Sequence, residues 1–62
     1  MKRNEFLRYI RSQGCELIRE GGRHSWWHNP LLHKRSAIPR HNEIIDNLAR
    51  KICKDLGIPS VK

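Results

Sequence analysis

The stretch GGRHSWWHNP, residues 21–30, decides how this chain folds. Its opening Gly-Gly pair is a strong turn signal, and Asn29-Pro30 favours the start of a second turn. Between the two turns lies RHSWWH, whose aromatic residues suit the pleated surface of a sheet. The stretch therefore predicts one β-strand over residues 23–28, bounded by a turn on each side.

The segments before and after this strand predict two more. CELIRE, residues 15–20, alternates between apolar and polar side chains, although Ile18 breaks the alternation. RSAIP, residues 35–39, predicts a third short strand, and Pro39 marks an edge position or the end of that strand because proline cannot donate to a ladder. Short turns join all three segments, so we expect a three-stranded antiparallel meander.

A helix is predicted on each side of the meander. KRNEFLRYIRSQG, residues 2–14, has apolar residues at helical spacing, a possible N-cap at Asn4, and Gly14 where a helix ends. A second helix follows a possible N-cap at Asn42 and ends at Gly57. Its apolar stripe consists of Ile44, Ile45, Leu48, Ala49, Ile52, Cys53 and Leu56.

These elements predict an α+β fold of order α-β-β-β-α, with a three-stranded antiparallel sheet and both helices on one face. This is the arrangement of a double-stranded-RNA-binding domain. The chain has 62 residues, so we expect a single domain over residues 1–62 with a thin core. The uncovered face of such a sheet is free to meet a partner.

Alternation along the second strand separates its two tryptophans. Trp26 shares a face with His24 and His28, whereas Trp27 lies on the opposite face. We expect Trp26 to be the core residue under the helices, with His24 partly sheltered at the end of the same face. Trp27 is then the exposed tryptophan, able to stack on a base.

The charge of the chain is strongly positive. Thirteen Lys and Arg against six Asp and Glu give a net charge of +7, which favours a polyanionic partner, with nucleic acid as the leading candidate. Improved solubility is the simpler alternative. No apolar run is long enough for a signal peptide or a membrane span, so we expect a cytoplasmic protein without membrane contact. Cys15 and Cys53 have no metal-ligand spacing and are predicted to be buried free thiols.

The four histidines raise the question of a metal site. His24 and His28 are four residues apart, which in a helix would bring both rings to one face. On a strand the same spacing separates them by about 13 Å, too far to share one ion. We therefore predict no metal and no cofactor. His28 and His33 are expected to be ordinary polar residues in or beside a loop, whereas His24 follows a glycine turn where backbone can approach a ligand closely.

The whole pattern resembles the HicA toxins, also called the YcfA-like family, which are the small ribonuclease components of HicA–HicB toxin–antitoxin pairs. The resemblance is carried by LIREGGRHSWWHNP, by SAIPRH and by a final helix that ends in LGIP. It extends from the first predicted helix to Gly57. The order of these short motifs over the whole chain makes the match specific.

The resemblance implies a double-stranded-RNA-binding-like fold and cleavage of messenger RNA without a metal. The single catalytic histidine of the family corresponds to His24. A HicB-like antitoxin is the implied partner and would cover the active face. The family often has serine or threonine where this chain has Arg23.

The chemistry of RNA cleavage supports the same residue. RNA carries its own nucleophile, the 2′-hydroxyl, so an imidazole to move a proton and cations to stabilise the phosphorane can suffice. His24 is the candidate base or acid. The candidate RNA-binding side chains are expected near the start of the second strand and are Arg23, Lys34, Arg35, Arg40 and His41.

Two non-catalytic functions are alternatives. An RNA-binding module on the same fold would use the same basic face without cleavage. A small DNA-binding domain is weaker, because neither predicted helix has a polar face with residues that read base edges.

Overall fold

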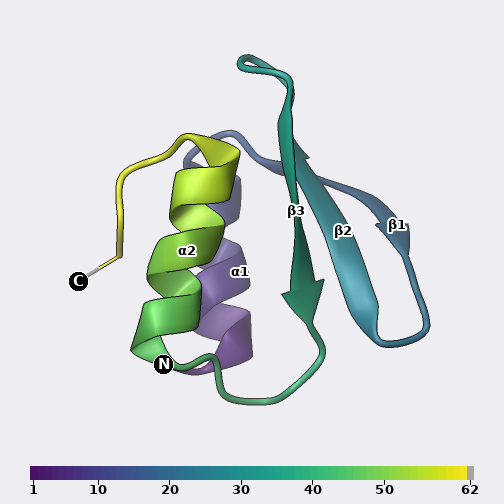
Figure 1. Cartoon of the computed structure of the whole chain (residues 1–62), viewed down its shortest axis with the longest axis vertical. Coiled ribbons are helices and arrows are strands. Elements are labelled where there is room, and N and C mark those ends of the chain that lie inside the picture. Colours follow the sequence, from purple (N-terminus) through teal and green to yellow (C-terminus); the bar gives the residue numbers. More distant parts are fainter. Residues whose placement is uncertain (62) are drawn as a thin grey trace.

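The computed structural model describes residues 1–61 and has five elements in the predicted order (Figure 1). They are α1 (Arg3–Ser12), β1 (Glu16–Glu20), β2 (His24–Asn29), β3 (Lys34–Pro39) and α2 (Asp46–Leu56). The α-β-β-β-α order and the α+β class are therefore confirmed. At 10 and 11 residues, neither helix of the described chain is long and apolar enough to cross a membrane.

The sheet is an antiparallel meander of order β1-β2-β3, with β2 in the centre. Pairing of β2 with β3 is regular from His24–Pro39 to Asn29–Lys34, and Pro39 ends an edge strand as predicted. Pairing of β1 with β2 shifts between Leu17 and Arg19. The irregularity falls at Ile18, the residue that breaks the alternation of the sequence.

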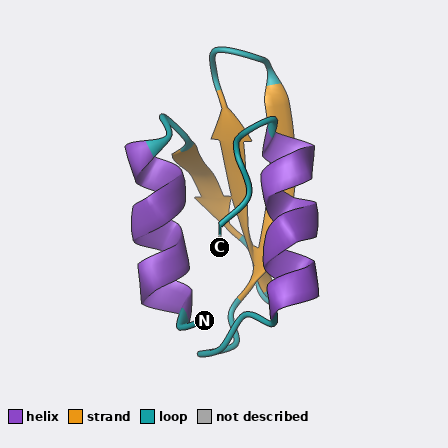
Figure 2. Cartoon of the chain, turned by 90° about the vertical axis from the view of Figure 1, so that its left-hand side faces the viewer, coloured by secondary structure: helices purple, strands orange, loops and turns teal. Residues whose placement is uncertain are grey.

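Both helices cover the same face of the sheet (Figure 2). Their apolar residues recur at helical spacing and are buried at Phe6, Leu7 and Ile10 of α1 and at Ala49, Ile52, Cys53 and Leu56 of α2. Ile38, Ile44 and the two free thiols of Cys15 and Cys53 complete this layer with one tryptophan. The other sheet face carries no helix, and we call it the open face.

The structure reverses the predicted roles of the two tryptophans. Trp27 is the core residue, with 1% of its surface exposed, whereas Trp26 is half-buried on the open face. His24 lies on that open face too and is exposed rather than sheltered. The reason is that polar residues of β2 have partners on the helix side, where the Asn29 side-chain amide donates to the Leu56 carbonyl at 2.9 Å. These long-range bonds fix the orientation of the strand.

The helix ends follow the glycine signals but not the predicted caps. Gly14 and Gly57 have φ values of 91° and 72°, the left-handed conformation that glycine adopts most easily. Asn4 lies inside the first turn of α1, and the N-cap of α2 is Ile45 rather than Asn42. Backbone pairing replaces a side-chain cap at α1, because the first helical amide donates to the Asn42 carbonyl at 2.8 Å.

Candidate active site

A shallow pocket of about 480 Å³ lies where β2 begins and β3 ends. Its lining consists of Gly22, Arg23, His24, Pro39, Arg40 and His41. His24 and Pro39 are paired residues of the ladder, so the segment that follows β3 places Arg40 and His41 beside the start of β2. Four of the predicted site residues therefore meet here, and they supply two imidazoles and two guanidinium groups.

The turn before β2 depends on Gly21. Its amide donates to the His24 carbonyl at 2.7 Å, which closes the β1–β2 connection. A Cβ on Gly21 would lie 2.8 Å from that same carbonyl oxygen, closer than real Cβ atoms approach backbone. Glycine is required here for space rather than for an unusual φ, and it fixes the backbone that carries His24.

Arg40 connects this turn to the end of β3. Its Nη2 donates to the Glu20 carboxylate at 2.9 Å and to the Gly21 carbonyl at 2.8 Å. The sequence predicts Arg40 as a phosphate-binding residue, and the structure adds a positioning role. A guanidinium has five N–H donors, so two contacts through Nη2 leave others for a ligand.

A second arginine supports the pocket from the helix side. Arg3 of α1 donates through Nε to the Pro39 carbonyl and through Nη2 to Ser25 Oγ, both at 2.8 Å. The Ser25 hydroxyl in turn donates to the Glu20 carboxylate, which also accepts from Arg40. This network joins α1, β1, β2 and β3 under the pocket. Sequence reasoning missed Arg3, Ser25 and Glu20, because Arg3 lies 22 residues from Ser25 and Arg40 lies 20 residues from Glu20.

The remaining side chains of the pocket are open to a ligand. Arg23, His24 and His41 are exposed, and within residues 1–61 none of the three makes a side-chain hydrogen bond or ion pair. Their neighbour Glu20 is already engaged by Arg40 and Ser25. The pocket is therefore a cationic surface with two accessible imidazoles, which suits a phosphate group.

Lys34 and Arg35 do not lie beside His24, contrary to the sequence-based expectation. They begin β3, which runs antiparallel to β2, so they pair with Asn29 and His28 at the far end of the ladder. His28 follows His24 by four residues in β2, so Arg35 lies about 13 Å from His24 along the strand direction. Arg40 and His41, which follow the end of β3, are the residues from this part of the chain that lie near His24.

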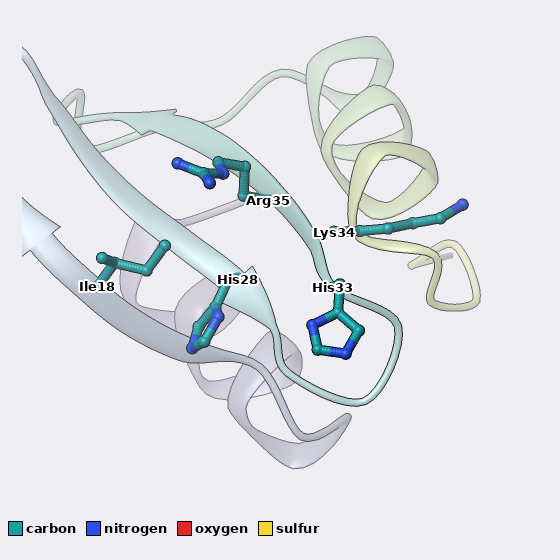
Figure 3. Close-up of a pocket in the computed structure, with 5 residues that line it drawn as sticks. All are labelled: Ile18, His28, His33, Lys34 and Arg35. Carbon is teal, nitrogen blue, oxygen red and sulfur yellow. The ribbon is translucent and has the colours of Figure 1, made fainter.

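This far end has a pocket of its own, of about 290 Å³ (Figure 3). Its lining consists of Ile18, His28, His33, Lys34 and Arg35. Figure 3 shows the Lys34 side chain extending away from the His28 and Arg35 side chains. The Lys34 stem instead passes beside Gly57, where an added Cβ would lie 3.1 Å from Lys34 Cδ.

The histidines are too dispersed to form an evident metal centre. His24 and His28 both lie in β2, as the strand prediction requires. Within residues 1–61, no three His, Cys, Asp or Glu side chains are grouped so that they could hold a metal ion. The chemistry available at the pocket is that of imidazole and guanidinium groups.

Comparison with known proteins yields one family. The family model described as HicA toxin of bacterial toxin-antitoxin matches residues 3–58, almost the whole 62-residue chain. No curated protein and no solved structure matches the chain. The match includes both helices, the whole sheet and every residue of the pocket at the start of β2.

Proposed function

Because this chain belongs to the HicA toxin family of bacterial toxin–antitoxin systems, we propose that it is an endoribonuclease that cleaves messenger RNA in the cytoplasm. A toxin of such a pair has an antitoxin as its partner, and we propose a HicB-like protein in that role. The observation that carries the proposal is the pocket where β2 begins and β3 ends, in which His24 and His41 lie with Arg23 and Arg40.

The proposed reaction uses the 2′-hydroxyl of the RNA as the nucleophile. His24 accepts the hydroxyl proton while the 2′ oxygen forms a bond to phosphorus and the bond from phosphorus to the 5′ oxygen breaks. His41 donates a proton to the departing 5′ oxygen. The products are a 2′,3′-cyclic phosphate and a 5′-hydroxyl end, and the step consumes no external nucleophile.

The arginines of the pocket serve the charge that develops at phosphorus. Arg23 is exposed at the pocket rim, and Arg40 is held in place by Glu20 and Gly21. Fixed cations beside the scissile phosphate stabilise a dianionic phosphorane more than the ground state. Lys34 and Arg35 lie too far along β3 for this role, so they act on RNA beyond the cleaved bond.

The antitoxin is proposed to recognise the same basic surface. A net charge of +7 favours an acidic partner, and charge steering makes association fast at low salt and slower as salt is added. An antitoxin that covers the pocket at the start of β2 would exclude RNA directly.

The decisive experiment compares the purified protein with a His24→Ala variant on a defined RNA in the presence of EDTA. We expect the wild type to leave cyclic phosphate ends and the variant to lose cleavage by at least about 100-fold. The variant should stay folded, because the His24 side chain is exposed and lies outside the core. Cleavage by the variant at the wild-type rate would overturn the catalytic assignment. Activity that vanishes with chelator and returns with one metal would overturn the metal-independent mechanism. Salt-sensitive RNA binding without cleavage would instead favour a non-catalytic RNA-binding module.

A further inference from the structure

Trp26 occupies the centre of the open face. It is flanked across the ladders by Arg19 of β1 and by Ala37 of β3. Ala37 has only a methyl group, so β3 places no large side chain beside the indole. Trp26 is half-buried and lies outside the hydrophobic core formed by the described residues.

The indole adjoins the turn that positions His24. Its Cδ1 atom lies 4.0 Å from the place that a Cβ on Gly21 would occupy. His24 and Trp26 are alternate residues of one strand, so they lie on the same face about 6.6 Å apart. A base next to the cleaved phosphate is close enough to reach this ring.

Side chains that can bind a phosphate continue beyond Trp26 on the same face. Arg35 pairs with His28 across the β2–β3 ladder, and His33 lies in the turn between these strands with a left-handed φ of 56° (Figure 3). Glu16 also lies on this face, but its carboxylate is 3.4 Å from His28 Nε2. The pocket at this end therefore presents Arg35 and His33 to a ligand.

We propose that the open face holds a second RNA subsite, in which one base stacks on Trp26 and a more distant phosphate binds Arg35 and His33. The RNA strand then runs along β2 from the pocket of His24 to the pocket of Arg35, a distance of about 13 Å. This inference rests on the proposed function for the identity of the ligand as RNA. It adds a binding site remote from the cleaved bond and a minimum length for the substrate.

The subsite requires an unpaired base. A base within a duplex has both faces stacked on its neighbours, whereas an unstacked base can lie on an aromatic side chain. Duplex RNA bound through the helices would leave Trp26 out of contact, because α1 and α2 cover the opposite face of the sheet (Figure 2). The position of Trp26 thus favours single-stranded RNA over duplex RNA on this fold.

The first test is RNA binding in a His24→Ala background, where the RNA stays intact. Trp27 is buried, so quenching of tryptophan fluorescence by a short single-stranded RNA should report Trp26 and should vanish in Trp26→Phe. Trp26→Ala should bind RNA about 5- to 150-fold more weakly, and Trp26→Phe should retain most of the affinity. Replacing the RNA bases one at a time with abasic sites should weaken binding at one position, and that effect should be absent in Trp26→Ala.

The second test uses a matched pair of arginines. Arg35→Ala should lower the slope of log affinity against log salt by about 0.7, the loss of one phosphate contact to single-stranded RNA. Arg50→Ala removes the same charge from α2 and should leave the slope unchanged. Within residues 1–61 the Arg50 side chain donates a hydrogen bond only to Asn47. The reverse result would place RNA on the helices and overturn the proposal.

The outcomes also separate the subsite from the proposed function. A wild-type protein that binds RNA through Trp26 without cleaving it would refute the ribonuclease and leave the subsite intact. Cleavage with full affinity in Trp26→Ala would refute the subsite and leave the ribonuclease intact. A Trp26→Ala variant that loses the antitoxin but keeps RNA affinity would also overturn the subsite, because the face would then serve a protein partner.

Discussion

Gly21 and His24 are joined across the β1–β2 turn by a 2.7 Å hydrogen bond from the Gly21 amide to the His24 carbonyl. A residue without a side chain thus fixes the backbone of the residue to which we assign catalysis. The same turn accepts a hydrogen bond from Arg40 at the Gly21 carbonyl. The imidazole is exposed at the surface, but the start of β2 that carries it is held from two sides.

Replacing Gly21 by alanine should therefore reduce catalysis more than it reduces folding. The new Cβ would lie 2.8 Å from the His24 carbonyl oxygen, so the turn must shift and move the imidazole. A shift near 1 Å costs about 100-fold in rate, whereas the crowding should cost about 1–3 kcal/mol of stability. RNA cleavage rates and urea unfolding measure the two effects.

Gly22→Ala is the matched control, since a Cβ there meets nothing within 4 Å. We expect it to keep cleavage within a few fold of the wild type. Equal losses in the two variants would mean that flexibility of the turn, rather than space at Gly21, governs His24.

The two tryptophans should differ sharply in their contribution to stability. Trp27 is 1% exposed in the core, so Trp27→Ala should lower the free energy of unfolding by about 3–5 kcal/mol. In a small domain this loss approaches the total stability. Trp26→Ala on the open face should cost about 1 kcal/mol or less. Urea titration followed by circular dichroism distinguishes the two, and the opposite order would contradict the orientation of β2.

The second histidine of the pocket should contribute to cleavage without holding the fold. His41 lines the pocket with His24 and is exposed. His41→Ala should therefore lower the cleavage rate by about 100-fold or more, as expected for the loss of a general acid, and should leave the free energy of unfolding within about 0.5 kcal/mol of the wild type. Cleavage rates at saturating RNA and urea unfolding measure the two effects. Cleavage by this variant at the wild-type rate would assign the acid to another group.

Asp55 should make stability depend on pH in acid. The hydrogen bond from Lys51 Nζ, at 2.8 Å, holds the pKa of this carboxyl below its usual 3.8, with a further bond from Ser36 Oγ. A lowered pKa means that the folded state favours the carboxylate. The contribution is therefore complete above the pKa of the unfolded chain and is lost as the pH falls through the folded value.

Asp55→Asn tests this contribution. Its effect should be less than about 1 kcal/mol at neutral pH, because Lys51 is exposed and Asp55 is partly exposed, so that water screens the pair. The wild type and the variant should converge in stability as the pH is lowered. A difference that stays constant through the acid range would mean that the carboxylate charge contributes nothing.

The element order follows from local signals, and the structure confirms it. The Gly-Gly and Asn-Pro turns, together with Gly14 and Gly57, divide the chain where the elements end. The faces of β2 have no such local signal, because HSWWHN places one tryptophan on each side. Distant partners decide which face of β2 packs against the helices. Arg3 donates a hydrogen bond to Ser25 Oγ, and the Asn29 side-chain amide donates to the Leu56 carbonyl, both on the helix side.

The candidate site was predictable in part. The side chains of the pocket meet because β2 begins where the neighbouring strand β3 ends. They are Arg23, His24, Arg40 and His41. The first residues of β3 could have been placed correctly from the antiparallel meander alone, since they must adjoin the end of β2. The bonds of Arg3 could not, because its partners lie 22 and 36 residues away.

The irregular register of β1 has a consequence for the chain in concentrated solution. β1 exposes Leu17 and Ile18 at an edge, an arrangement that invites a second sheet to add on. The shift between Leu17 and Arg19 interrupts the line of free backbone groups, and at the opposite edge Pro39 lacks an amide to donate. Each border of the small sheet thus contains a feature that discourages aggregation through strand addition.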